Sequence, residues 1–306
     1  MDALSKILET IKFKGVVYDR RQLSAPWGLD IPQNEASQFW RLLKGTCFLK
    51  IPGSPPLEMM EGDLVFVPHG SAHWIADHPR SPRVSSMDYR RARDNGTPMF
   101  TGDGDMTVLL GGHFEFDTRP AHPFLKDLPG VIHIAEFDTS AHAWLQHTVQ
   151  LIFDEVTHDR PGSKVILGRL AEVAFVHLIR AYLEQGEDAK GFLLALKDER
   201  ISKALKLIQE FPEKEWTLEA LSSAAGMSRS LFCNEFKRLV GETPLSYLTN
   251  WRMTRARELL VTGKGNMSEV AMDVGYQSEA AFNRVFKKKV GVTPASFRRD
   301  KKHGVA

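Results

Sequence analysis

The residues best suited to chemistry form two sets that lie 50 positions apart. The first set contains Arg229, Ser230, Cys233 and Asn234, and the second contains Glu279, Ala280, Asn283 and Arg284. Within each set the spacing is that of one helix face. Short or polar side chains on the N-terminal half of a helix can form hydrogen bonds with base edges in a DNA major groove. These residues therefore indicate binding to double-stranded DNA, and Arg284 is the strongest single candidate because its fork matches guanine O6 and N7.

An internal repeat contains both sets. Nine of the 21 positions from 227 to 247 are identical to the positions 50 residues later, namely Ser228, Phe232, Phe236, Lys237, Val240, Gly241, Thr243, Pro244 and Ser246. Ordinary composition would give about one or two such identities. The repeat therefore predicts two copies of one structural unit.

Each copy is punctuated as a helix, and the first copy shows the pattern. Ser228 can cap an N-terminus, while Phe232 and Phe236 belong to a buried apolar stripe. Gly241 can end the helix in a left-handed conformation, and Pro244 can begin the next helix.

A shorter helix and a glycine precede each of these helices, which predicts helix-turn-helix units at 217–241 and 268–291. The segment from Pro244 to Val261 is long enough for one helix of about 27 Å. Such a helix could hold the two units so that they enter successive major grooves, which lie about 34 Å apart. Further DNA contacts are expected from Lys237, Gln277, Ser278 and Lys287.

The segment from residue 201 to residue 299 resembles the AraC/XylS-type DNA-binding domain. The resemblance rests on the repeat and on the motifs Trp251-Arg-Met253, Val270-Ala-Met-Asp-Val-Gly-Tyr276 and Gly291-Val-Thr-Pro294. It implies a bacterial transcription regulator that recognises DNA through the two helices, with RNA polymerase as a partner if it is an activator. Asn234 departs from the arginine that is usual in the family, whereas Arg284 retains it.

Length and composition predict two globular domains. The chain has 306 residues, of which 42% are hydrophobic and 25% are charged. It has no apolar run of 18 residues and does not begin with a signal peptide, so we expect a cytoplasmic protein. From residue 200 onward there are 19 basic and 11 acidic residues, a net charge of +8, whereas the remainder has 21 basic and 27 acidic residues, a net charge of −6. The positive charge therefore accompanies the recognition helices, where it can neutralise phosphates.

The N-terminal part predicts a β sandwich or small barrel. Strand-like runs separated by turns occur at 15–18, 39–43, 47–51, 63–67 and 107–110. The stretch Gly62-Asp-Leu-Val-Phe-Val-Pro-His-Gly-Ser-Ala-His73 fits the second cupin motif, and residues 1–135 resemble a cupin jelly roll. The region is similar to the cupin sensor domain of some AraC-type regulators, including regulators that respond to reactive chlorine species. The chain is then an α+β protein of two domains, a cupin with a helical extension and an all-α double helix-turn-helix.

The predicted cupin could hold a small ligand or a metal ion. Trp40, His73 and His113 are candidates for a ligand pocket, and His69, His73 and His113 are candidates for a metal site. Trp40 stands where the cupin family places a metal-binding histidine, so a ligand-binding or structural barrel is favoured. The alternative is a metal-dependent cupin enzyme fused to a helical domain. We expect a small-molecule effector, and neither enzymatic activity nor catalytic residues.

Residues 136–190 predict two helices and a linker. Apolar residues recur at helical spacing from Ser140 to His158 and from Gly162 to Glu184. The second stripe is wider than packing between two helices requires, which favours a homodimer interface. Packing of the same surface on the cupin is the alternative. A polar linker at 185–190 leads to the DNA-binding domain, which we place at 198–300.

Overall fold

The structure is a computed structural model that describes residues 2–11, 13–116, 122–135, 140–158, 160–185, 191–263 and 265–303. The chain divides into two compact units. The sandwich unit combines Phe13–Asp117 with Leu128–Asp188, and the helical unit combines Met1–Lys12 and Thr118–Asp127 with Ala189–Ala306. The predicted domain boundaries differ from this division. The predicted helical region belongs to the sandwich unit, and two short segments from the N-terminal half belong to the helical unit.

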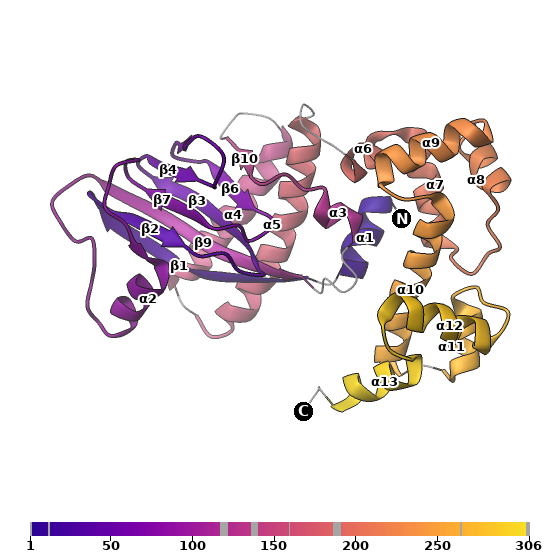
Figure 1. Ribbon diagram of the computed structural model, residues 1–306. Helices are drawn as coiled ribbons and strands as arrows, with labels where there is room; N and C mark the ends of the chain where they lie inside the picture. Colours follow the sequence, from indigo (N-terminus) through magenta and orange to yellow (C-terminus); the bar gives the residue numbers. More distant parts are fainter. Residues whose placement is uncertain are drawn as a thin grey trace. The chain divides into compact units, whose positions relative to one another are not determined.

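Two five-stranded sheets form the sandwich unit (Figure 1). In spatial order the first sheet contains β1 (Phe13–Ser24), β9 (Met106–Phe116), β3 (Ser37–Lys44), β6 (Leu64–Val67) and β10 (Ile132–Ile134). The second contains β5 (Leu57–Met59), β4 (Cys47–Lys50), β7 (His73–Ala76), β2 (Gly28–Ile31) and β8 (Val84–Ser85), and helix α2 (Ser86–Asp94) follows β8. The predicted β sandwich is confirmed.

Both faces of the first sheet carry apolar side chains. Successive residues of a strand point to opposite faces, so neighbouring apolar residues lie on different sides of the sheet. Trp40 of β3 points into the core between the sheets, where Val65 and Leu109 also lie. Its neighbour Phe39 lies on the other face, with its ring 5.2 Å from the ring of Phe114. The outer face therefore needs its own cover.

Helices α4 (Ser140–His158) and α5 (Ser163–Gln185) belong to the same unit, and α5 covers the outer face of the first sheet. Phe175 of α5 has its ring 5.0 Å from Phe114 and 5.7 Å from Phe66. A Cβ on Gly15 of β1 would lie 2.4 Å from the Cβ of Ala171, so glycine permits the close approach of α5. Packing on the sandwich therefore accounts for part of the apolar surface of α5.

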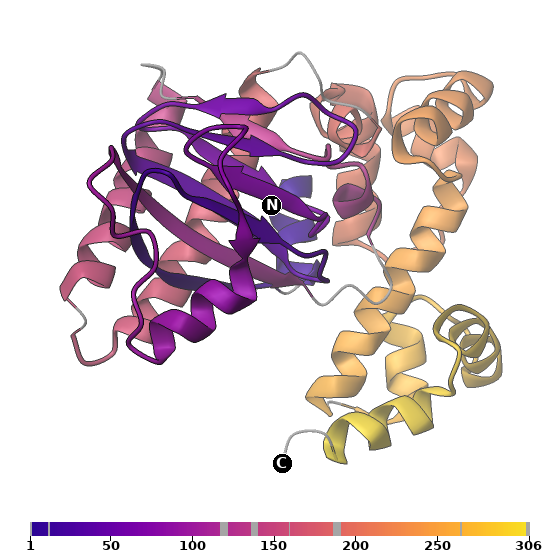
Figure 2. The ribbon, with the colours of Figure 1, turned by 60° about the vertical axis from the view of Figure 1, so that its left-hand side comes forward.

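The helical unit contains the predicted helix-turn-helix units. Its C-terminal helices are α6 (Phe192–Lys197), α7 (Glu199–Glu210), α8 (Leu218–Ala224), α9 (Arg229–Val240), α10 (Pro244–Thr262), α11 (Met267–Asp273), α12 (Glu279–Val290) and α13 (Pro294–His303). Figure 2 shows α10 as one continuous helix that leads from the first group of these helices to the second. None of the helices in the described part of the chain is both long and apolar enough to cross a bilayer.

Two segments from the N-terminal half complete the helical unit. They form α1 (Ala3–Ile11) and α3 (Pro123–Lys126). Ile7 of α1 and Phe124 of α3 are fully buried. Asp127, directly after α3, accepts the backbone N–H of Phe192 at 2.7 Å and so satisfies the first turn of α6. The core of the DNA-binding region therefore includes residues far outside the predicted limits of 198–300.

Candidate nucleic-acid interface

Helices α8 and α9 form the first helix-turn-helix unit, and α11 and α12 form the second. Ser228 accepts a backbone N–H at the start of α9 at 3.4 Å, and Ser278 does the same for α12 at 3.3 Å. Gly241 ends α9 with a φ of 83°, and Gly291 ends α12 with a φ of 91°. Glycine adopts this left-handed conformation without a steric cost. The predicted beginnings and ends of both helices are confirmed.

The two units have nearly the same core geometry. The rings of Phe232 and Phe236 lie 5.5 Å apart at an angle of 59°, and those of Phe282 and Phe286 lie 5.5 Å apart at 57°. All four rings are fully buried. Because equivalent faces are anchored by equivalent phenylalanines, the opposite faces of α9 and α12 are presented in the same way relative to their own cores.

Those opposite faces carry the predicted DNA-binding residues. The exposed members are Arg229, Ser230, Asn234, Lys237, Gln277, Ser278, Glu279, Ala280, Arg284 and Lys287. The half-buried members are Cys233 and Asn283. Each helix therefore presents short and polar side chains near its N-terminus and a lysine toward its C-terminus.

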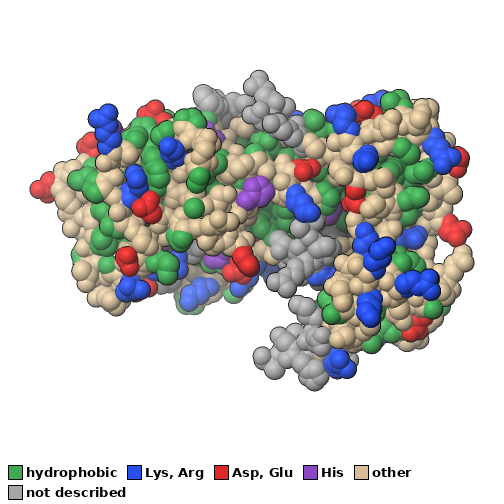
Figure 3. Space-filling view, viewed as in Figure 1, with side chains coloured by type: hydrophobic (Ala, Val, Ile, Leu, Met, Phe, Trp, Pro, Cys, Tyr) green, Lys and Arg blue, Asp and Glu red, His purple; other side chains and the backbone are tan. Residues whose placement is uncertain are grey.

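Two arginines of the first helix-turn-helix unit form ion pairs with neighbouring glutamates. Arg229 lies 3.1 Å from Glu219, but both side chains are more than half exposed, so the pair is weak and the guanidinium can exchange it for a DNA contact. Arg238 lies 2.7 Å from Glu235, and its hydrogen bond lowers the pKa of that carboxyl group. Lys and Arg side chains are prominent on the face of the helical unit seen in Figure 3.

Helix α10 runs between the two helix-turn-helix units, and a buried polar contact with α7 holds its N-terminal half. Gln209 of α7 donates to the Tyr247 hydroxyl at 2.8 Å, and its backbone carbonyl accepts the Trp251 indole N–H at 3.4 Å. Burial raises the pKa of Tyr247, so the hydroxyl stays protonated. The N-terminal half of α10 is thus fixed to α7, and the Tyr247 ring also lies 5.9 Å from the ring of Phe236 in the first unit. Met253 and Leu260 of α10 belong to the apolar core of the second unit.

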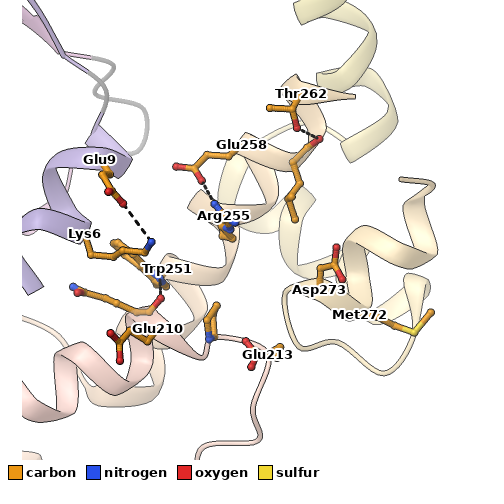
Figure 4. A pocket seen from close by; sticks show the side chains of 13 residues that line it. Lys6, Glu9, Glu210, Glu213, Trp251, Arg255, Glu258, Thr262, Met272 and Asp273 are labelled. Atoms are coloured by element: carbon orange, nitrogen blue, oxygen red, sulfur yellow. Dashed lines mark hydrogen bonds and ion pairs between the residues drawn. The ribbon is translucent and has the colours of Figure 1, made fainter. Parts of the chain in front are cut away.

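A cavity of about 740 Å³ beside α10 has the wrong charge for DNA (Figure 4). Its acidic lining residues are Glu9, Glu210, Glu213, Glu258 and Asp273. Its cations Lys6 and Arg255 are paired with Glu9 and Glu258 at 3.3 and 2.8 Å. Phosphate groups are repelled by such a surface, so it lies outside the candidate interface.

The structure brings together two of the three predicted ligand-pocket residues in the sandwich unit. The indole Nε1 of Trp40 lies 3.0 Å from Nε2 of His73, and both side chains are buried. His73 also lines a cavity of about 450 Å³, together with Trp74, Asp30 and Lys50. The third predicted residue, His113, does not take part in this contact. Its Nε2 lies 3.1 Å from Glu115.

The candidate metal ligands are also engaged by protein groups. His69 Nε2 lies 2.8 Å from the carbonyl oxygen of Leu128, and His73 uses both ring nitrogens in hydrogen bonds. Among the residues that the structure describes, no three His, Cys, Asp or Glu side chains are grouped so that they could hold a metal ion.

Sequence reasoning missed one residue of the sandwich core. The guanidinium of Arg21 lies 5.1 Å from the ring of Trp40 and 5.4 Å from the ring of Tyr89, and only 5% of the residue is exposed. This places a cation beside the Trp40–His73 pair. The alternation of faces along its strand could have predicted that Arg21 points inward. The rings that it contacts could not be predicted in this way, because Trp40 and Tyr89 are distant in sequence.

Known proteins show the same combination of domains. Residues 2–184 match the Cupin family, and residues 221–300 match the Helix-turn-helix domain family. The chain is 31% identical over 302 residues to an AraC-like transcription regulator of Streptomyces antibioticus, covering 98% of this chain and 99% of that protein. It is 29% identical over 303 residues to the HTH-type transcriptional regulator AlkR of Acinetobacter baylyi, covering 97% and 99%.

A further relative matches the predicted subgroup. The RCS-specific HTH-type transcriptional activator RclR of Escherichia coli is 26% identical over 301 residues, covering 97% of each chain. These relatives are regulators along their whole length, so the protein is a regulator and the alternative of a cupin enzyme is not supported. The chain belongs to the AraC-type family of DNA-binding transcription regulators and carries a cupin domain ahead of its helix-turn-helix units.

Proposed function

We propose that this regulator places α9 and α12 in successive major grooves of its operator. The observation that carries this proposal is the matched anchoring of the two helices by Phe232, Phe236 and their equivalents, which leaves two polar faces exposed. Arg229, Ser230, Cys233 and Asn234 would contact one groove. Glu279, Ala280, Asn283 and Arg284 would contact the next, and the lysines toward the helix C-termini would contact phosphates.

Footprinting with hydroxyl radicals tests this proposal. A duplex selected from a random pool by the wild-type protein should show two protected patches about 10–10.5 bp apart on one side of the DNA for each protomer. The double variant Ser230→Ala/Asn234→Ala should lose one patch, and Asn283→Ala/Arg284→Ala should lose the other. Each variant is the control for the other helix. Loss of both patches with either variant, in folded protein, would contradict separate groove contacts.

The proposed regulator acts as a homodimer through α4 and α5. Trp144, Leu151 and Val165 are 67%, 55% and 70% exposed, and Ile166 and Val173 add apolar surface on α5. Exposed apolar residues that gather on neighbouring helices favour a protein partner. Since most soluble oligomers are symmetric assemblies of identical chains, a second copy of the chain is the favoured partner.

Sedimentation of point variants tests the dimer. Leu151→Arg should shift the wild-type dimer to monomer at micromolar concentration. Met87→Arg is the matched control, because Met87 is exposed to a similar extent, 62%, but lies on α2. A wild-type protein that sediments only as a monomer, or a Leu151→Arg protein that stays dimeric, contradicts this interface.

The proposed signal is a small molecule or chemical stimulus received by the cupin. The cavity lined by His73, Trp74, Asp30 and Lys50 is large enough for a small ligand. A regulator of this type works where the chromosome is, in the cytoplasm, and an activator would also contact RNA polymerase. Screening metabolites for an increase in the melting temperature of wild-type protein, and its loss in a Trp74→Ala variant, tests the cavity.

A further inference from the structure

Arg252 lies near the middle of α10 and is held by the loop that precedes the first helix-turn-helix unit. Its Nε donates to the carbonyl oxygen of Pro212 at 2.7 Å, and its Nη2 donates to the carbonyl oxygen of Lys214 at 2.9 Å. A guanidinium has several donors in a rigid plane, so it can bind two carbonyls of one loop at once. This loop leads directly to Thr217, which caps α8.

The other side of the same guanidinium meets the turn of the second unit. Its Cζ lies 5.5 Å from the centre of the Tyr276 ring. Gly275 has a φ of 80°, and a Cβ on it would lie 2.5 Å from Arg252 Nη2. The turn between α11 and α12 therefore packs closely on the guanidinium, and a residue with a side chain at position 275 would displace it.

A second contact joins the same two regions. Gln277, which lies just before the cap of α12, donates to Glu215 at 2.8 Å. The loop before α8 is thus linked to the start of α12 both through Arg252 and directly. The buried apolar residues of α10 do not bridge the two regions in this way. Tyr247 and Trp251 lie in the N-terminal half of α10, whereas Met253 and Leu260 pack in the core of the second helix-turn-helix unit.

We infer that Arg252 is a positioning residue that sets the spacing and relative rotation of the two recognition helices. It acts through α9 and α12, because the loop at 212–214 and the turn at 275–276 hold its guanidinium between them. The residue would therefore control how strictly the protein measures the distance between the two half-sites. This inference rests on the proposed binding of α9 and α12 in successive grooves.

One base pair of extra spacer moves a half-site by about 3.4 Å and rotates it by about 34–36° around the DNA axis. A rigid pair of helices cannot follow that rotation, whereas a loosened pair can. The selected operator and duplexes with the half-sites one base pair closer or farther therefore separate rigid from loose variants. A duplex that keeps only one half-site reports on each recognition surface alone.

The variants are Arg252→Gln, which removes the charge and the fork, and Arg252→Lys, which keeps the charge and at most one carbonyl contact. Arg255→Gln is the matched control, since Arg255 is exposed on the same helix and forms an ion pair with Glu258 (Figure 4). Circular dichroism shows whether each variant is folded. If Arg252→Gln is not folded, Arg252→Lys carries the test.

Wild-type protein and Arg255→Gln should bind the natural spacing at least tenfold more tightly than either altered spacing. In the Arg252 variants this ratio should fall at least threefold, while affinity for the single half-site stays within twofold of wild type. An unchanged ratio in the folded Arg252 variants overturns the inference. If the wild-type protein itself shows no spacing preference, the proposed two-groove function fails, which is a separate result.

Discussion

Trp40 and His73 form a hydrogen bond inside the sandwich unit, with the indole Nε1 donating to the imidazole Nε2 across 3.0 Å. The other ring nitrogen of His73, Nδ1, lies 2.9 Å from the carbonyl oxygen of Ser71 and therefore carries the proton. Burial lowers the pKa of His73, which keeps the ring neutral. The Nε2 lone pair of His73 is therefore occupied by the indole N–H of Trp40.

Replacing Trp40 by Phe should destabilise the sandwich unit. His73 Nε2 would lose its donor in a buried site, which costs about 1–3 kcal/mol of unfolding free energy. Denaturant unfolding of Trp40→Phe measures this loss, and Trp74→Phe is the control because Trp74 is only half-buried. In the double variant Trp40→Phe/His73→Phe the loss should be smaller than the sum of the single losses, since the unpaired acceptor is gone. Additive losses would mean that the hydrogen bond contributes nothing.

Replacing Arg284 by Ala should weaken specific DNA binding. A bidentate contact with guanine contributes about 1–3 kcal/mol of discrimination, so affinity for the operator should fall by about 5- to 150-fold while binding to unrelated DNA changes little. Fluorescence anisotropy with both duplexes measures the difference. Lys288→Ala is the control, because Lys288 lies toward the C-terminus of the same helix and should affect both duplexes alike. Equal losses on both duplexes with Arg284→Ala would make it a phosphate contact.

The helical unit shows how far local sequence signals reach. Ser228, Gly241 and Pro244 act on the backbone within one turn of their own positions, so the ends of α9 and the start of α10 were predictable. The same holds for α4, which spans the predicted residues Ser140–His158. Caps and periodicity need no knowledge of distant residues.

Long-range packing was not predictable in the same way. Helix α3 begins at a proline, and the hydrogen bond that links the end of α3 to α6 joins Asp127 and Phe192, which are 65 positions apart. Residues 192–196 are apolar, and the helix that forms there has its first backbone N–H satisfied by Asp127. Strands β2 and β7 have four residues each, too few for a clear alternation. The base contacts of Asn234 and Arg284 depend on the DNA itself.

Removing Lys237 or Lys287 should reduce the salt dependence of DNA binding. Each exposed lysine that neutralises a phosphate contributes about 0.9 to the slope of log affinity against log salt concentration. Lys237→Ala and Lys287→Ala should each flatten that slope by about this amount on specific and unrelated DNA alike. Lys164→Ala, an exposed lysine on α5 of the sandwich unit, should leave it unchanged. A slope that stays at the wild-type value in either helix variant would show that the lysine remains solvated.

His122 should make the helical unit sensitive to acid. Its ring lies 5.1 Å from Phe192, its Nδ1 accepts the Phe124 N–H, and burial lowers its pKa to about 3. The pKa of an unfolded histidine is about 6.5. Between these two pKa values the opened state binds a proton that the folded state does not, so the stability of the helical unit falls as the pH falls. Hydrogen exchange of the first turns of α10, corrected for intrinsic rates, should accelerate by up to about tenfold per pH unit below pH 6.5. His122→Asn can still cap α3 but should lose this dependence, whereas His158→Asn, at the exposed end of α4, should keep it. An acid dependence that persists in His122→Asn would assign it to another group.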